Sequence, residues 1–143
     1  MPLRADATLD RFVNRGDGFL PGLVGVRILA IAEGRVDADL EIRPDLLAPN
    51  GFLHAASVIA LADTACGYAC IAHLPEGAQN FTTIELKSNF LGTVRSGGIA
   101  CVATAAHLGR STQLWDAVVR DKSTERTIAL FRCTQMILWP RPA

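Results

Sequence analysis

Hydrophobic and polar residues alternate along two adjacent stretches near the start of the chain. The first stretch runs from Val26 to Ala32. In the second stretch, charged residues flank these apolar positions: Val36, Ala38, Leu40 and Ile42. A period of two is typical of β-strands with one buried face and one face in water. Because the turn signal Glu33-Gly34 lies between the stretches, the pattern predicts a β-hairpin.

A different pattern begins after the Asn50-Gly51 turn. From about His54 to Ala72 the chain is apolar on every helical face, and Asp63 is its only carboxylate. A helix without a polar stripe is normally buried, so we expect this helix in the core. Asp63 should then lie where few waters reach it and its ionised form is costly. Pro75-Glu76-Gly77 ends the segment.

Four strand-like segments follow at hairpin spacing. They are Thr82–Leu91, Ile99–His107, Thr112–Asp121 and Thr127–Trp139. Residues 1–25 mix charge, Gly and Pro, and predict only a short helix around Leu9–Val13 and then a loop. The order predicts a single α+β domain over residues 1–143, with an antiparallel sheet of about six strands wrapped around one long buried helix. The sheet's outer rim and the helix's exposed end would be left for a partner chain.

Composition and charge narrow the class of protein. Half of the residues are hydrophobic, which predicts that part of the apolar surface forms an oligomer interface. Fourteen basic and fourteen acidic residues cancel, so we do not expect nucleic-acid binding. The N-terminus lacks the apolar core of a signal peptide, and Asp63 disfavours a membrane span for the apolar helix. We therefore expect a cytoplasmic protein without a membrane partner.

Asp63 and His54 are the candidate chemical groups. Burial raises the pKa of a carboxyl group, which makes Asp63 a better base near neutral pH than a surface aspartate. His54 lies at the helix start, where unpaired N–H groups and the helix dipole stabilise developing negative charge. The same dipole disfavours an imidazolium, so we expect a neutral, donating His54. A general base together with an oxyanion site needs no metal and no nucleophilic Ser or Cys.

The spacing of these two residues constrains the site. His54 and Asp63 are nine residues apart, which on a helix means about 180° of rotation and about 13.5 Å of rise. They cannot act on one atom within a single chain. If both are catalytic, Asp63 of one subunit must face His54 and Ala55 of another across a two-fold dimer.

Three segments carry a family resemblance. They are Gly51-x-x-His54-Ala55-Ala56 with Leu61-Ala62-Asp63-Thr64-Ala65, then Glu85–Leu91, and then His107-Leu108-Gly109-Arg110-Ser111. Through them the chain, from about Gly18 to Trp139, resembles the hotdog-fold thioesterases and specifically the PaaI-like group that hydrolyses acyl-coenzyme A. The chain departs from the family pattern at Ala55 and Ala56, where glycines usually follow the histidine.

The resemblance implies a hotdog fold and a role for each matching residue. Asp63 would be the general base or the nucleophile, and His54 with the Ala55 N–H would hold the thioester carbonyl. Asn50 would replace the family's Asn or Gln, which falls at Ala48 here. The implied substrate-binding residues are Gly51, Thr64, Asn89, Gly109, Arg110 and Ser111. The resemblance implies no cofactor beyond the coenzyme A of the substrate, and a homodimer assembled as a tetramer.

Other interpretations stay open at the level of sequence. The chain could bind an acyl ligand without catalysis, and a hotdog dehydratase is disfavoured because the His-Phe-Pro-Gly-type loop is absent. Arg110 could be an ordinary exposed turn residue, and Asn89 could belong to the wet face of a strand. The four cysteines lie in apolar runs and are expected to be buried thiols. Cys66 and Cys70 with His73 form a weak alternative, a metal site.

Overall fold

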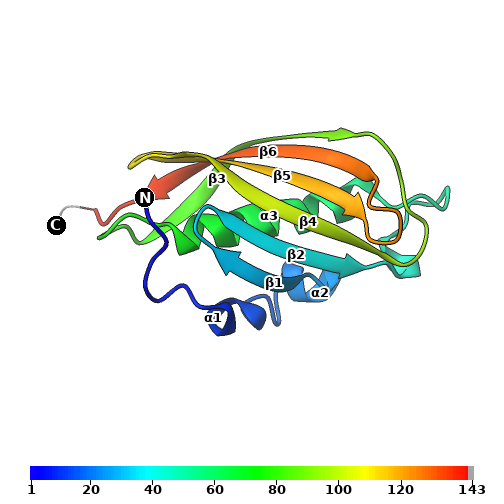
Figure 1. The fold of residues 1–143 in the computed structure, drawn as a ribbon, viewed down its shortest axis with the longest axis horizontal. Helices are drawn as coiled ribbons and strands as arrows, with labels where there is room; N and C mark the ends of the chain where they lie inside the picture. The colour runs from blue at the N-terminus through cyan, green and yellow to red at the C-terminus, as the bar shows by residue number, and fades with distance from the viewer. Residues whose placement is uncertain (142–143) are drawn as a thin grey trace.

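The computed structural model describes residues 1–141 and shows one antiparallel sheet curved around one long helix (Figure 1). The elements are α1 (Leu9–Val13), α2 (Leu20–Val24), β1 (Arg27–Ala32), β2 (Arg35–Glu41), a short 3-10 turn (Pro44–Leu46), α3 (Ala55–Ala72), β3 (Asn80–Phe90), β4 (Gly98–Leu108), β5 (Thr112–Asp121) and β6 (Thr127–Leu138). The strand order is β1-β2-β4-β5-β6-β3, so β1 and β3 are the edges. The predicted α+β class and the wrapped sheet are confirmed.

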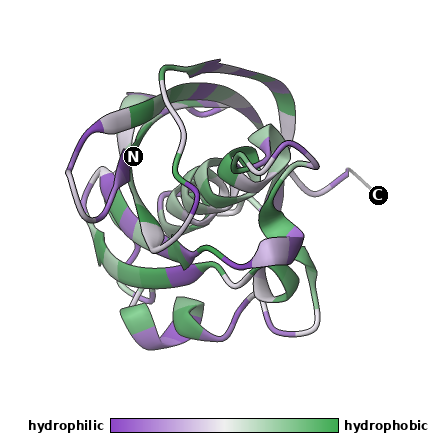
Figure 2. Ribbon diagram, turned by 90° about the vertical axis from the view of Figure 1, so that its right-hand side faces the viewer, coloured by the Kyte–Doolittle hydropathy of each residue, from purple (hydrophilic) through white to green (hydrophobic). Residues whose placement is uncertain are grey.

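α3 forms the centre of the core, and it packs against all six strands. Figure 2 shows the sheet curving around this helix when the domain is viewed from the end at which α3 begins. Small buried residues such as Ala62, Ala65 and Ala69 allow the strands to approach the helix closely. Larger side chains, including Leu40 and Trp115, fill the space between the helix and the sheet.

A buried histidine fixes the end of α3. His73 Nδ1 lies 2.8 Å from the Ala69 carbonyl oxygen, and Nε2 accepts the N–H of Gly34 at 2.9 Å. Burial lowers the pKa of His73, which keeps the ring neutral. Both ring nitrogens are therefore occupied, and residues 1–141 contain no group of three His, Cys, Asp or Glu side chains placed to hold a metal ion. The structure does not support the metal site of Cys66, Cys70 and His73.

Two local expectations were wrong. α2 lies in the region expected to be a loop, because Pro21 occupies its first turn, where a missing N–H costs nothing, and Gly25 ends it at φ 87°. The strand ends also differ slightly. β3 begins at Asn80 instead of Thr82, and β6 ends at Leu138 instead of Trp139.

α3 is not covered on every side, in contrast to the expectation from its apolar sequence. One stripe of the helix is only partly buried or exposed: Ala56, Ile59, Ala60, Asp63, Thr64 and Tyr68. The neighbouring edge strand β3 also exposes large apolar side chains: Ile84, Leu86 and Phe90. The uncovered apolar surface therefore runs along α3 and β3, and not only at the helix end.

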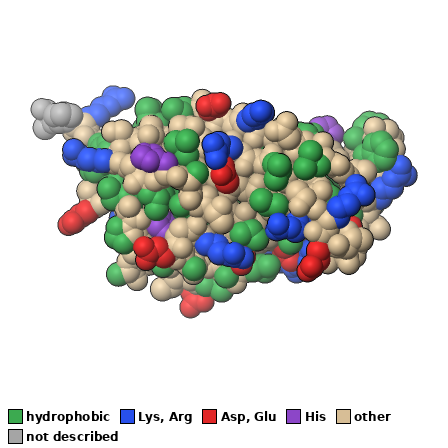
Figure 3. Space-filling view, turned by 45° about the horizontal axis from the view of Figure 1, so that its top comes forward, with side chains coloured by type: hydrophobic (Ala, Val, Ile, Leu, Met, Phe, Trp, Pro, Cys, Tyr) green, Lys and Arg blue, Asp and Glu red, His purple; other side chains and the backbone are tan. Residues whose placement is uncertain are grey.

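α3 is long and apolar enough to cross a membrane by length and composition alone, but 56% of it is buried inside the domain. A core helix has the same properties, and the sheet around α3 accounts for them. Acidic and basic side chains are interspersed on the face of the molecule shown in Figure 3, and no continuous basic surface covers that face.

Candidate functional site

His54 is the N-cap of α3 and presents a hydrogen-bond donor outward. Its Nδ1 accepts the backbone N–H of Ala56 at 2.9 Å. Because Nδ1 is an acceptor, the neutral ring carries its proton on Nε2. Within residues 1–141 the backbone N–H of Ala55 has no hydrogen-bond partner, and both residues are exposed. The positive end of the helix thus offers two donors to a ligand oxygen.

The loop before α3 is a closed turn that positions these donors. Ala48 N–H donates to the Phe52 carbonyl at 2.7 Å, and Gly51 N–H donates to the Ala48 carbonyl at 2.8 Å. Gly51 has φ 83°, a left-handed conformation that other residues adopt only with strain. Asn50 Oδ1 accepts the Phe52 N–H at 3.1 Å, so the Nδ2 amide is the free group of Asn50.

A pocket of about 440 Å³ opens beside the start of α3. Its apolar wall is formed by Phe52, Leu53, Val58, Phe90 and Ile128. Its polar groups come from Asn50, His54, Ala55 and Thr93. Thr93 Oγ1 accepts the N–H of Leu53 at 3.3 Å and ties the loop after β3 to the loop before α3. The pocket joins an apolar space to the two donors of the helix start, which suits an acyl group with a carbonyl at one end.

Asp63 lies in the middle of α3 and points toward β3. Its Oδ1 is buried and has no hydrogen-bond partner among the described residues. Burial raises the pKa of Asp63, and the Thr83 hydroxyl on β3 lies close enough to oppose this effect whenever it donates to the carboxylate. The Thr83 hydroxyl donates its one proton to Gln135 Oε1, at 2.8 Å. Asp63 is therefore a poorly satisfied carboxylate with raised basicity, as expected for a group that acts on a substrate or water.

Gly67 lies one turn after Asp63, where α3 approaches β3 closely. A Cβ at position 67 would lie 3.0 Å from the Phe81 ring. A larger residue there would displace that ring. The helix and the edge strand therefore meet closely beside Asp63.

The structure does not bring Asp63 and His54 together in one chain. The pocket at the start of α3 includes His54 and Asn50 but not Asp63. Asp63 lies on the partly uncovered stripe of the helix, with Thr64 beside it. The two parts of the candidate site are complete only if a second chain supplies the missing half.

Asn89 lies away from both parts of the site. A β-bulge between Thr83 and Glu85 shifts the strand register, so Thr83 and Phe90 face inward while Asn89 pairs with Leu130 on the outer face. Unbroken alternation would place residues 83 and 89 on the same face. Asn89 is therefore not next to the other predicted site residues within one chain, and its role in substrate binding stays a prediction.

Gly109, Arg110 and Ser111 lie at the other end of the domain from His54 (Figure 1). Their hairpin is tied to the end of β6, because Ile137 N–H donates to the Ser111 carbonyl at 2.9 Å. The Arg110 guanidinium lies over the Trp139 ring, 4.7 Å from its centroid. Gly109 is required by close packing, since a Cβ there would lie 2.8 Å from the Thr112 carbonyl oxygen.

Three contributors to the site were missed by the sequence analysis. Thr83 and Phe90 reach it from β3, and Arg95 places its guanidinium 4.6 Å from the centroid of the Phe52 ring at the pocket. Only the strand assignment indicated Thr83 and Phe90, and the bulge hid which face Thr83 occupies. Nothing in the local sequence distinguishes Arg95 from a solvent-exposed turn residue.

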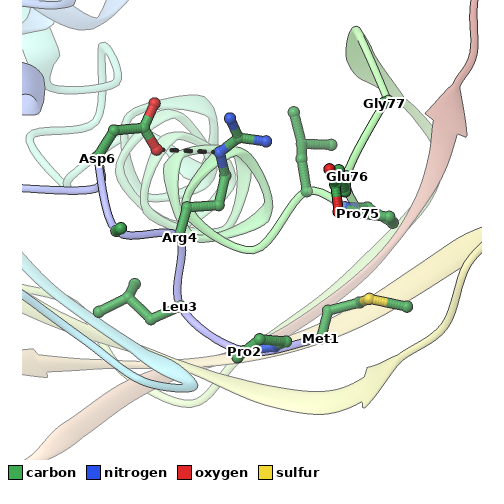
Figure 4. Close-up of a pocket in the computed structure, with 10 residues that line it drawn as sticks. Met1, Pro2, Leu3, Arg4, Asp6, Pro75, Glu76 and Gly77 are labelled. Carbon is green, nitrogen blue, oxygen red and sulfur yellow. Dashed lines mark hydrogen bonds and ion pairs between the residues drawn. The ribbon is translucent and has the colours of Figure 1, made fainter.

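A larger pocket of the described chain lies away from this site. It measures about 680 Å³ and lies between residues 1–6 and the segment Leu74–Gly77, at the end of α3 (Figure 4). Its polar groups include Arg4 and Asp6, which form an ion pair with each other at 3.0 Å. No residue of the candidate site lines it, so its size alone does not identify it as the site of chemistry.

Comparison with known proteins identifies the family to which the chain is similar. The sequence pattern of the thioesterase superfamily matches residues 50–128. The 1,4-dihydroxy-2-naphthoyl-CoA hydrolase of Listeria monocytogenes is 28% identical over 111 residues, which cover 78% of this chain and 89% of that protein.

Solved structures extend the similarity to the fold. A thioesterase from Haemophilus influenzae superposes with a TM-score of 0.88 at 26% identity, covering 96% of this chain and 95% of that one. The PaaI protein from the phenylacetic acid degradation operon of Escherichia coli superposes with a TM-score of 0.75 at 24% identity, covering 82% and 83%. The segment matched by the superfamily pattern contains His54, Asp63 and Arg110.

Proposed function

The chain belongs to the thioesterase superfamily and is a thioester hydrolase, and we propose that it cleaves an acyl-coenzyme A ester to the free acid and coenzyme A. The observation that carries this proposal is the unsatisfied carboxylate of Asp63 on the same helix whose first turn presents two free donors beside an apolar pocket. A base and an oxyanion site are what hydrolysis of a thioester needs.

The proposed reaction takes place between two subunits. The partly uncovered stripe of α3 and the apolar edge strand β3 form the surface that a second copy would cover. If two α3 helices lie antiparallel about a two-fold axis, Asp63 of one subunit approaches His54 of the other, and the reverse pair forms a second site. A homodimer is therefore the smallest active unit, and a tetramer would be an assembly of two such dimers.

In each site the thioester carbonyl oxygen accepts hydrogen bonds from His54 Nε2 and the Ala55 N–H. The partner's Asp63 takes a proton from water as the water oxygen bonds to the carbonyl carbon. These two hydrogen-bond donors stabilise the negative charge on the oxygen of the tetrahedral intermediate. Its collapse breaks the C–S bond and releases the carboxylic acid, and the coenzyme A thiolate leaves and takes up the proton. In the alternative nucleophilic route, Asp63 attacks the same carbon, the C–S bond breaks as the coenzyme A thiolate leaves and takes up a proton, and water then hydrolyses the mixed anhydride.

The acyl group is proposed to be aromatic. The pocket presents two phenylalanine rings, those of Phe52 and Phe90, around a space of about 440 Å³. The Listeria relative is named for a bicyclic aromatic CoA ester, which supports the same choice. Ala55 and Ala56 carry methyl groups where relatives have glycine, so the approach to the carbonyl is narrower here.

Thiol release from a panel of acyl-coenzyme A esters tests the function. The panel would contain benzoyl, phenylacetyl, hydroxynaphthoyl, hexanoyl and octanoyl esters, with free thiol measured by a colorimetric reagent. We expect the aromatic esters to give the highest kcat/KM. Binding of these esters without thiol release would contradict hydrolysis and favour the non-catalytic ligand-binding alternative.

The coenzyme end of the substrate gives a prediction for Arg110. In the antiparallel dimer the end of one α3 lies near the start of the other, so the partner's Arg110 approaches the mouth of the pocket. Arg110→Ala is expected to raise KM about 5- to 10-fold for the full coenzyme A ester, the scale of one lost charge-assisted contact with a phosphate. It should change KM for the matching pantetheine thioester, which lacks the nucleotide phosphates, by less than about 2-fold.

Arg120→Ala is the matched control, because Arg120 is an exposed arginine near the far end of β5, the strand that follows the turn of Arg110. Steady-state kinetics on both substrates measure the effect. Equal changes in KM for both substrates, or the same change in Arg120→Ala, would contradict a phosphate contact at Arg110.

A further inference from the structure

Gln135 is a fully buried polar residue with no assigned role. It lies on the inward face of β6 with none of its surface exposed, and it pairs with Thr83 across the β6–β3 ladder. Its Oε1 accepts the Thr83 hydroxyl at 2.8 Å, and its Nε2 donates to Cys133 Sγ at 3.2 Å. The contact with the Cys133 sulfur orients the amide so that the oxygen faces Thr83.

The hydroxyl of Thr83 also lies next to Asp63, so Gln135 and Asp63 compete for one proton. A hydroxyl has a single O–H and can donate it to only one acceptor at a time. In this structure the proton goes to Gln135, and Asp63 Oδ1 stays buried without a donor. A hydrogen bond donated to a carboxylate stabilises the charged form and makes it a weaker base. The direction of one hydroxyl therefore affects the basicity of Asp63.

We propose that Gln135 is a positioning residue that holds the Thr83 hydroxyl away from Asp63 and thereby keeps the carboxylate available to take a proton. This inference rests on the proposed function, because it assumes that Asp63 acts on water or the thioester. The bulge after Thr83 adds to the arrangement, because it keeps Thr83 facing inward while the next residues change face. The cost of burying a polar amide in the core is offset by its two hydrogen bonds.

Few other titratable or charged groups lie near enough to Asp63 to affect its pKa. On α3 the titratable neighbour is the buried Cys66 thiol, which contacts Cys133 of β6 and whose pKa is well above its ordinary value. On β3 the charged residues Glu85 and Lys87 lie on the outer face, opposite to Thr83. Among the described residues of β1, β2, β4, β5 and α2, no charged side chain shifts the pKa of Asp63. In the proposed dimer, the partner's His54 is the remaining titratable neighbour.

The pH profile of kcat/KM tests this role. Gln135→Met removes the acceptor but keeps the length and volume of the side chain, so the Thr83 hydroxyl should turn to Asp63. We expect the acidic limb of the pH profile to shift to lower pH by about one unit. The plateau value of kcat/KM should fall about 3- to 10-fold, because a weaker base accepts protons less readily. A residue that only supports the fold would lower activity without moving the limb.

Thr83→Val is the matched control, because valine has the shape of threonine without the hydroxyl. Since the hydroxyl is already turned away from Asp63, the limb of Thr83→Val should stay close to that of the wild type. In the double variant Thr83→Val/Gln135→Met the downward shift should disappear. A second readout is the carboxyl ¹³C chemical shift of Asp63 in aspartate-labelled protein, assigned by its loss in Asp63→Asn.

The pH profiles of these variants can contradict either the positioning role of Gln135 or the catalytic role of Asp63. A limb that does not move in Gln135→Met, or that moves equally in the Thr83→Val background, overturns the positioning role. If Gln135→Met does not fold, Thr83→Val alone decides, because a rise of the limb by about one unit would show that Thr83 already donates to Asp63. An acidic limb that persists in Asp63→Asn would instead overturn the proposed function, since another group would then be the base.

Discussion

Asp63→Asn is expected to lower kcat for thioester hydrolysis by at least ~10²-fold, the usual effect of removing a general base. Asparagine has nearly the same size and shape as aspartate, but it cannot accept a proton from water or attack the carbonyl carbon. KM should change little, because the acyl pocket and the two donors at His54 and Ala55 are separate from Asp63. Steady-state kinetics with the best ester of the panel measure both constants.

Thermal stability provides the control for this variant. We expect Asp63→Asn to lose activity but to gain thermal stability. The pKa of Asp63 is raised by burial, so the folded state holds the proton more tightly than the unfolded state. Stability is therefore lost as the pH rises from the unfolded pKa through the folded pKa, and the penalty is fully present above the folded pKa. Asp63→Asn avoids it and should raise Tm by about 2–4 °C at pH 7, the shift that ~1 kcal/mol gives in a domain of this size.

The gain in Tm should shrink as the pH falls toward the ordinary pKa of 3.8, because Asp63 becomes neutral in both states below that pH. Thermal unfolding of both proteins between pH 4 and pH 8 measures the difference. A variant that is well folded and still fully active would remove Asp63 from the mechanism. A variant that loses both activity and stability would show that Asp63 supports the fold instead of the chemistry.

Periodicity predicted most of the fold because each long element repeats one pattern without interruption. The alternation from Val36 to Ile42 predicted β2, and the apolar run from His54 predicted α3 with His54 at its start. These patterns reflect burial on one face of a strand or around a core helix, which the sequence records directly. α2 was missed because Pro21 and Gly22 resemble loop residues when they occupy a single helical turn.

The candidate site was predicted less completely, for two physical reasons. A single bulge residue, Ile84, reverses the inward and outward faces of β3, and no composition signal marks it. Thr83 was therefore overlooked, whereas the alternation from Lys87 to Phe90 already indicated the outer face for Asn89, and only the family resemblance gave Asn89 a substrate-binding role. The second reason is that hydropathy does not distinguish a helix buried in its own domain from one covered by a second copy. The partly exposed stripe around Asp63 became visible only once the sheet was in place.

A mixture of Asp63→Asn and His54→Ala should regain activity that neither variant has alone. His54→Ala removes one of the two donors to the carbonyl oxygen and is expected to lower kcat/KM by roughly 10- to 10³-fold. In a mixed dimer with shared sites, one site contains both substitutions, while the other site combines an intact Asp63 with an intact His54. Random assortment makes about half of the dimers mixed, each with one of two sites restored. The activity should approach about a quarter of that of the wild type.

The two variants would carry different affinity tags and be co-expressed, so that mixed dimers can be purified and verified by mass spectrometry. The matched control is Asp63→Asn combined with the double variant Asp63→Asn/His54→Ala. Its mixed dimers contain no intact Asp63 and should remain inactive. The restoration follows from the nine residues that separate His54 and Asp63 on one helix, which place them about half a turn apart in direction and about 13.5 Å apart along the axis. Verified mixed dimers without activity would contradict the shared site, and with it the assignment of which groups meet at the thioester.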